Sequence, residues 1–248
     1  MRKIVLIGIG TGHPDHITVE GVNALNGADL VLLPTKGADK ADLADLRRGI
    51  VARHGVTPPA IRAFALPVRA AENPAYLDGV GDWHAEIAAL YAQLLGETQE
   101  DAMVALLVWG DPSLYDSTLR ILARVKAAGL DFSLRVVPGI TAIQALTAAF
   151  CIPLNTLGAP VLITTGRRLA EGWPEGADTV AVMLDGKQSF THLVGRDLHI
   201  WWGAYLGSTD QMLIEGALDA VADRIVEARA AARARHGWIM DTYLLRRR

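Results

Sequence analysis

The sequence has few of the features that mark secreted, membrane or nucleic-acid-binding proteins. Among its 248 residues there is one cysteine, so no disulfide can form within the chain, which suits a reducing cytoplasm. No apolar run in the sequence reaches the ~18 residues that a membrane-spanning helix needs. The formal net charge of -3 provides no overall positive field for nucleic acid. We therefore expect a cytoplasmic protein that binds neither membrane nor nucleic acid.

The composition is that of a folded protein with a large apolar interior. Hydrophobic residues make up 51% of the chain and charged residues 21%, and the length suffices for one large or two ordinary domains. The single cysteine, Cys151, lies in the apolar segment AAFCIPL, with no adjacent charge that would stabilise a thiolate. We expect a buried structural thiol rather than a nucleophile.

The first half of the chain repeats a strand, a loop and a helical pattern. Short apolar runs predict strands at residues 4–9, 28–33, 65–68, 104–109 and 134–137. This alternation favours a parallel sheet with helices on both faces.

The second half has a different texture. Strand-like segments lie at residues 161–165, 179–184, 200–206 and 238–245, with one long helix expected at residues 211–235. So many strands for so few long helices indicate a mixed sheet. The sequence therefore predicts an N-terminal α/β domain over residues 1–139 and a C-terminal α+β domain over residues 140–248.

Two loops at the ends of predicted strands could hold a ligand. Residues 8–14 read GIGTGHP, and alternating glycines let backbone amides approach a bound group. A dinucleotide fingerprint would need glycine where His13 stands, so NAD or FAD binding is disfavoured. After the run at residues 104–109 come Gly110, Asp111 and Pro112, at the end of the strand where open α/β sheets bind ligands. The same three residues are also common turn chemistry.

Basic residues gather between residues 36 and 69, interleaved with aspartates. Arg47 and Arg48 lie in a helical pattern there, and a second pair, Arg167 and Arg168, follows a predicted strand. Two interpretations stay open, a solvated helix face and a cationic rim for a carboxylate-bearing substrate.

Four separated motifs occur in a specific order: the glycine loop, VWGDPSLY, VVPGITA and IWWGAYLGSTDQMLIEG. In that order they resemble the tetrapyrrole (corrin/porphyrin) methylases, and the likeness covers nearly the whole chain. Each motif alone is weak, but the ordered set is specific. The resemblance implies a two-domain class III S-adenosylmethionine-dependent methyltransferase fold, with a cofactor cleft between a parallel-sheet domain and a mixed-sheet domain.

The resemblance also implies a cofactor, an acceptor and a set of site residues. S-adenosyl-L-methionine would be the methyl donor and S-adenosyl-L-homocysteine its product, and the protein would be a homodimer. The segments LLPTKGADKADLADLRRGIV and GDWHAEIAALYAQLL are similar to family members of cobalamin biosynthesis that methylate precorrin-5 at C-1 and expel its acetyl group as acetate. The positions that match the family's cofactor contacts are Pro14, Trp109, Gly110, Asp111, Leu114, Thr141, Ala142, Met183, Gly203 and Ala204.

The acid/base group is the least determined part of this expectation. His13 stands where the family's glycine loop usually has aspartate, which makes it the first candidate for the base that assists deacetylation. Asp15, His16 and Asp111 stay open as alternatives. Arg47 and Arg48 are expected to bind carboxylates of the substrate, and no metal is expected. Other functions also stay open: methylation of another precorrin or of a diphthamide precursor, or a non-catalytic tetrapyrrole carrier.

Overall fold

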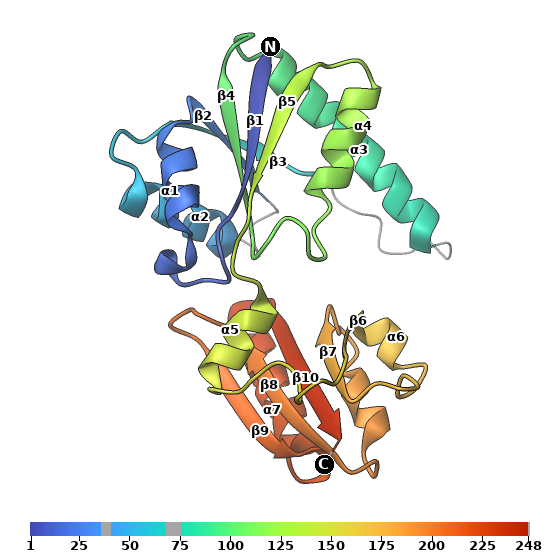
Figure 1. Ribbon diagram of the computed structural model, residues 1–248. Coiled ribbons are helices and arrows are strands. Elements are labelled where there is room, and N and C mark those ends of the chain that lie inside the picture. The colour runs from blue at the N-terminus through green and yellow to red at the C-terminus, as the bar shows by residue number, and fades with distance from the viewer. Residues whose placement is uncertain (36–40, 68–75, 248) are drawn as a thin grey trace. The chain divides into compact units, whose positions relative to one another are not determined.

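The computed structural model describes residues 1–35, 41–67 and 76–247, which form two compact units (Figure 1). The first unit consists of Met1–Gly10 and Pro14–Ile140, and the second of Thr11–His13 and Thr141–Arg248. The sequence placed residues 11–13 in the first domain, whereas they group with the second unit.

The first unit is built on a parallel five-stranded sheet in the order β3-β2-β4-β1-β5. Its strands are β1 (Arg2–Gly8), β2 (Leu30–Thr35), β3 (Ala60–Ala65), β4 (Met103–Val108) and β5 (Phe132–Val137). Its helices are α1 (Val19–Asn26), α2 (Ala41–His54), α3 (Tyr76–Gly96) and α4 (Thr118–Ala127), with a short 3-10 helix η1 (Pro14–His16).

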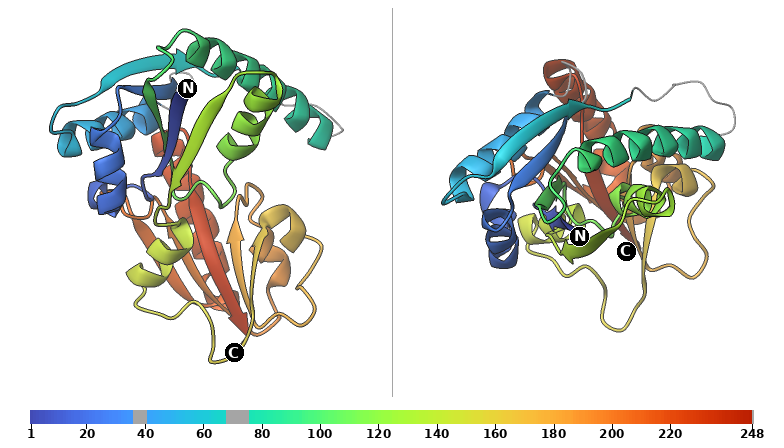
Figure 2. Two further views of the ribbon diagram at one scale, coloured as in Figure 1. Left: turned by 45° about the horizontal axis from the view of Figure 1, so that its top comes forward. Right: turned by 90° about the horizontal axis from the view of Figure 1, so that it is seen from above.

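Alternate side chains of β1 pack into two different cores, one on each face of the sheet. Ile4 and Leu6 point into a core shared with α3 and α4, while Val5 and Ile7 point into a core shared with α1 and α2. The helices α3 and α4 lie side by side against the sheet (Figures 1 and 2). A strand buried on both faces is apolar at nearly every position, which is why β4 and the buried part of β1 read as continuous apolar runs.

The second unit contains a mixed sheet in the order β6-β7-β10-β8-β9. Its strands are β6 (Val161–Thr165), β7 (Thr179–Met183), β8 (Leu198–Ala204), β9 (Met212–Ala217) and β10 (Asp241–Arg247). Only β6 and β7 pair in parallel, and the other neighbours are antiparallel. The helices are α5 (Ala142–Ala149), α6 (Gly166–Leu169) and α7 (Leu218–His236), with the 3-10 helix η3 (Ser189–Leu193).

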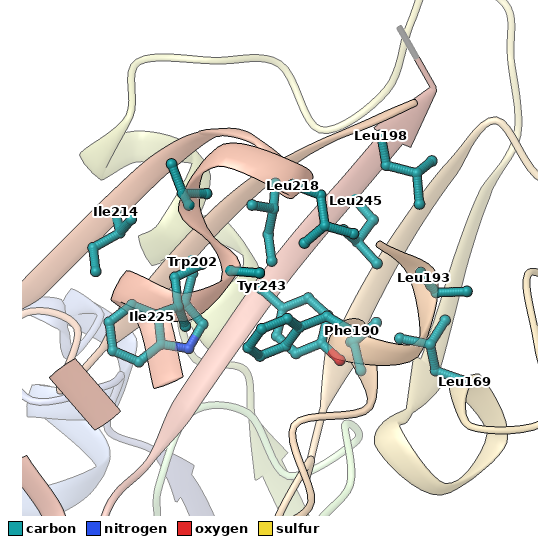
Figure 3. Close-up of a cluster of buried hydrophobic side chains, with 14 of the residues drawn as sticks. Leu169, Phe190, Leu193, Leu198, Trp202, Ile214, Leu218, Ile225, Tyr243 and Leu245 are labelled. Carbon is teal, nitrogen blue, oxygen red and sulfur yellow. The ribbon is translucent and has the colours of Figure 1, made fainter. Parts of the chain in front are cut away.

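The core of the second unit is apolar and aromatic. Figure 3 shows Trp202 and Tyr243 from neighbouring strands beside Phe190 of η3, with Ile225 of α7 in the same cluster. Phe190 and Tyr243 meet edge to face, with ring centroids 5.3 Å apart. The predicted class, a parallel-sheet unit followed by a mixed-sheet unit, is confirmed.

Several local predictions were wrong. The helix expected at residues 211–235 is two elements, because Met212–Ala217 pairs with β8 as an edge strand and the helix begins only at Leu218. Gly216 has a φ of +149°, a backbone conformation that does not continue a helix. The third strand is Ala60–Ala65 rather than residues 65–68. Cys151 is exposed rather than buried, because it lies in the turn after the end of α5 and not within the helix.

No helix in the described part of the chain is both long enough and apolar enough to span a membrane.

We predict that Gly166→Ala destabilises the second unit by about 1–3 kcal/mol, because the new methyl group overpacks a closed site. A Cβ on Gly166 would lie 2.2 Å from the Asp185 carboxyl carbon. Gly186→Ala is the matched control, since a Cβ there meets no atom within 4 Å in the described structure. Chemical denaturation of both variants measures the difference, and equal stabilities would contradict the packing argument.

Candidate active site

Three glycines at the ends of β1, β4 and β5 meet in the first unit. A Cβ on Gly8 would lie 2.6 Å from the Gly139 nitrogen, and one on Gly139 would lie 2.2 Å from the Gly110 carbonyl oxygen. Gly110 and Gly10 also exchange hydrogen bonds, at 2.8 Å from the Gly110 N–H and 3.3 Å from the Gly10 N–H. Only residues without a side chain allow this approach. The motifs GIGTGHP, VWGDPSLY and VVPGITA are therefore parts of one cluster.

Asp111 ties two of these loops together. Its Oδ2 accepts a hydrogen bond from the Gly139 N–H at 2.8 Å, and its Oδ1 accepts one from the Ser113 N–H at 2.8 Å. Partial burial alone would raise the pKa of Asp111, but the hydrogen bonds from Ser113 and Gly139 together hold it below its ordinary value. A carboxylate so engaged is a weak base, so this geometry favours a positioning role over proton transfer.

The other candidate residues of the first unit surround this loop in sequence. Trp109 follows β4 directly and is half-buried, as is Leu114, whose N–H donates to the Asp111 carbonyl at 3.2 Å. Pro14 begins η1, and its carbonyl oxygen lies 3.0 Å from His54 Nε2. The structure thus places Trp109, Asp111 and Leu114 on a single loop after β4.

The candidate bases have different surroundings. His13 is exposed and belongs to the second unit, where a Cβ on the neighbouring Gly12 would lie 3.1 Å from the Leu206 carbonyl oxygen. Asp15 forms an ion pair with Arg53 at 2.8 Å. His16 is half-buried in η1. Among these four residues, the imidazoles of His13 and His16 are the groups whose chemistry suits a base near neutral pH.

Thr141 and Ala142 begin α5 in the second unit. The Thr141 side chain caps the helix, accepting from the Gln144 N–H, while the Thr141 N–H donates to Gln144 Oε1 at 2.9 Å. This reciprocal arrangement is a capping box, and its sequence signature, Thr-x-x-Gln, was readable from residues 141–144. The first N–H groups of such a helix favour a bound anion.

Met183, Gly203 and Ala204 lie at the same end of the mixed sheet, where β7 and β8 finish. Tyr243 of β10 pairs with Val182 of β7 on one side and with Trp202 of β8 on the other. Since β7 and β8 run in the same direction, their last residues end beside one another across β10. The Thr242 hydroxyl, opposite Gly203, donates to the Val182 carbonyl at 2.8 Å. Residues twenty positions apart in the sequence are therefore brought together.

Arg47 and Arg48 do not act as a pair. Arg47 is half-buried, and its Nε donates to the Leu107 carbonyl at 3.0 Å, just beyond the point where β2 and β4 cease to pair. Burial lowers the pKa of Arg47, an effect that Tyr91 and Asp116 oppose. Arg48 is exposed and forms an ion pair with Asp45 at 2.8 Å. Successive residues of a helix point about 100° apart, which explains the contrast.

The rest of the basic stretch is mostly paired at the surface. Arg53 binds Asp15, and Arg62 binds Glu97 at 2.5 Å. In the second basic pair, Arg168 binds Glu171 at 3.1 Å and Arg167 is exposed. Lys36, Lys40 and Arg69 lie outside the described residues. The described part of this stretch supports a solvated, ion-paired surface more than a continuous cationic rim.

The sequence did not predict a buried polar network that lies next to the strand end carrying Met183. Asp185 accepts hydrogen bonds from the Tyr243 hydroxyl at 2.6 Å and from the Ser189 N–H at 2.6 Å. The Asp185 carbonyl accepts from Arg229, which forms an ion pair with Asp241 at 2.9 Å. The residues of this network come from the loop after β7, from α7 and from β10, so no local sequence pattern marks them. Among the described residues, no group of three or more His, Cys, Asp or Glu side chains could hold a metal ion.

Comparison with known proteins extends these observations. The family model for Tetrapyrrole (Corrin/Porphyrin) Methylases matches residues 3–222. The precorrin-6A synthase [deacetylating] of Sinorhizobium sp is 55% identical over an alignment of 251 residues that covers 100% of this chain and 96% of that protein.

Solved structures agree with this relationship. A cobalamin synthesis related protein (CobF) from Corynebacterium diphtheriae has a TM-score of 0.86 and 40% identity, covering 99% of this chain and 98% of that one. The uroporphyrin-III C-methyl transferase from Thermus thermophilus, solved as a complex with S-adenyl homocysteine, shares the fold with a TM-score of 0.56 at 16% identity, covering 98% and 96% of the two chains. This chain therefore belongs to the tetrapyrrole (corrin/porphyrin) methylase family.

Proposed function

We propose that this protein methylates precorrin-5 at C-1 with S-adenosylmethionine and releases the acetyl group of the substrate as acetate, forming precorrin-6A in cobalamin biosynthesis. The observation that carries the proposal is the 55% identity, over the full length of this chain, to a precorrin-6A synthase [deacetylating]. A cytoplasmic homodimer belongs to the same proposal.

We assign the cofactor to loops of both units. The first unit would contribute Pro14, Trp109, Gly110, Asp111 and Leu114, and the second Thr141, Ala142, Met183, Gly203 and Ala204. The chemistry of this set fits S-adenosylmethionine. Leucine, methionine and alanine side chains suit the apolar faces of an adenosine, and the start of α5 suits the carboxylate of the methionine part. When bound, the cofactor supplies an electrophilic methyl group.

The protein's own residues would then act mainly by positioning. Methyl transfer to carbon is an in-line displacement that needs no side-chain nucleophile, and orientation alone can account for about 7–11 kcal/mol of a barrier. The close packing of Gly8, Gly110 and Gly139 fixes the loop after β4 for this task. Loss of the acetyl group requires water to add to its carbonyl, and His13 is our candidate for the base that assists.

Substrate carboxylates are assigned to Arg48 rather than equally to both arginines. Arg48 is exposed and its ion pair with Asp45 is at the surface, where such pairs contribute little and exchange easily. Arg47 is committed to the Leu107 carbonyl, so its contribution would be to hold α2 against the end of β4.

The first test is calorimetric titration of the purified protein with S-adenosylhomocysteine, with NAD as the control ligand. We expect binding of S-adenosylhomocysteine with a dissociation constant in the micromolar range, of order -8 kcal/mol, and no binding of NAD. Addition of precorrin-5 and S-adenosylmethionine should then yield acetate in equal amount to the methylated product. Failure to bind S-adenosylhomocysteine would remove the proposal.

For the base, we predict that His13→Ala lowers the rate of acetate release by about 10²–10⁴-fold, the usual contribution of a general base. The affinity for S-adenosylhomocysteine should change little, because the carbonyls and amides of the loop are kept. His192→Ala, which removes another exposed histidine of the second unit, is the control. Acetate release by His13→Ala at the rate of the control would exclude this role.

Asp111 provides a test through pH. A carboxyl whose pKa is lowered on folding stabilises the protein above its unfolded pKa of about 3.9, and that contribution is lost as the pH falls through the folded pKa. On going from about pH 6 to about pH 3, wild type should therefore lose more unfolding free energy than Asp111→Asn does. Urea denaturation at both pH values measures this, with the exposed Asp131→Asn as control. Equal losses in wild type and Asp111→Asn would contradict the proposal that the ionised Asp111 carboxylate holds the two loops together.

A further inference from the structure

Three residues of the proposed cofactor site are each followed by a residue with an unusual backbone conformation. In the described part of the chain, six residues other than glycine have a positive φ. Three of these six are Tyr115 (+53°), Leu184 (+55°) and Tyr205 (+49°). They come directly after Leu114, Met183 and Ala204. Side chains disfavour this conformation, and where it persists it is held by surrounding structure, frequently at ligand sites.

Leu184 differs from the other two in its exposure. Its side chain is 65% exposed, against 41% for Tyr115 and 5% for Tyr205. Tyr205 is fixed in the core, where its hydroxyl donates to the Trp238 carbonyl at 2.6 Å. An exposed leucine alone needs no explanation. A leucine held outward in a disfavoured conformation, directly after Met183, does need one.

The buried network described above is what holds Leu184 in place. The next residue, Asp185, is anchored through its carboxylate to Ser189 and Tyr243 and through its carbonyl to Arg229. Gly166 packs against the same carboxylate so closely that no side chain fits there. With Asp185 fixed inside and Met183 ending β7, the chain turns outward at Leu184. Leu184 thus lies between the end of a strand and a residue whose carboxylate and carbonyl are both hydrogen-bonded.

We propose that Leu184 is a ligand-contacting residue whose side chain packs on the face of a flat heterocyclic ring. The inference rests on the proposed function, in which two such rings are available, the adenine of the cofactor and the tetrapyrrole acceptor. An aliphatic side chain presented rigidly at a strand end gives such a ring an apolar platform without the entropic cost of ordering a mobile side chain.

The test compares wild type, Leu184→Ala, Leu184→Met and a control, Leu157→Ala, in the full chain. Leu157 is fully exposed in the same unit but is remote in sequence from every proposed site residue. We expect Leu184→Ala to weaken a ligand about tenfold, which corresponds to the loss of a few buried methyl groups. Leu184→Met should keep most of the affinity, and thermal midpoints should agree with wild type because the side chain is exposed.

Two readings identify the ring. Weaker S-adenosylhomocysteine binding by Leu184→Ala in calorimetry supports contact with adenine. Unchanged binding together with a higher KM for precorrin-5, at saturating S-adenosylmethionine, supports contact with the macrocycle. If wild type binds S-adenosylhomocysteine and Leu184→Ala changes neither quantity, or changes them no more than Leu157→Ala, the inference is overturned while the proposed function stands. If wild type does not bind S-adenosylhomocysteine, both are overturned.

Discussion

The first unit depends on the close approach of three backbone segments at Gly8, Gly110 and Gly139. Adjacent parallel strands fan apart at their ends because sheets twist, and loops normally follow them outward. Here the segments after β1, β4 and β5 stay in contact, because no side chain separates them and because Asp111 accepts the Gly139 N–H. A methyl group at any of these glycines would force the loops apart. The proposed cofactor loop is therefore shaped by missing side chains as much as by the side chains it carries.

In the second unit, buried polar side chains rather than glycines lie beside the candidate residues. Three of its candidate residues, Met183, Gly203 and Ala204, stand at the ends of β7 and β8, beside a buried polar network centred on Asp185. Burial raises the pKa of Tyr243, an effect that the neighbouring Asp185 reinforces, so its hydroxyl stays a hydrogen-bond donor. The ion pair between Arg229 and Asp241 is nearly inaccessible to water, and burial raises the pKa of Asp241 against the opposing effect of Arg229. Such a pair is weak evidence for stability, but its hydrogen bond ties α7 to the first residue of β10.

The sequence predicted the layers better than the individual positions. Strands buried on both faces produce continuous apolar runs, so β1 and β4 could be located within a residue or two. Two edge strands, β3 and β9, were misplaced, because each is only partly buried and contains a charged residue, so neither forms a continuous apolar run. The edge strand β6 was nevertheless predicted at its observed bounds, Val161–Thr165. The glycine loops were found because close approach restricts residue type. The Asp185 network was missed because its members, distant in sequence, meet only when β10 inserts between β7 and β8.

Adjacent charges illustrate the limit of reading function from composition. Arg47 and Arg48 look equivalent in the sequence, yet one guanidinium satisfies the Leu107 carbonyl where β2 and β4 separate and the other meets solvent and Asp45. The separation itself follows from topology, because the chain leaves β2 toward β3 and leaves β4 toward β5, in opposite directions. Open sheets bind ligands at such switch points, and here the half-buried Arg47 donates to the carbonyl of Leu107 beside it. An arginine in that place costs desolvation whether or not a substrate is bound, so it must be offset by contacts within the protein. Its hydrogen bond to Leu107 is such a contact, which is why the proposed function gives Arg47 the task of holding α2 and assigns the substrate carboxylates to Arg48.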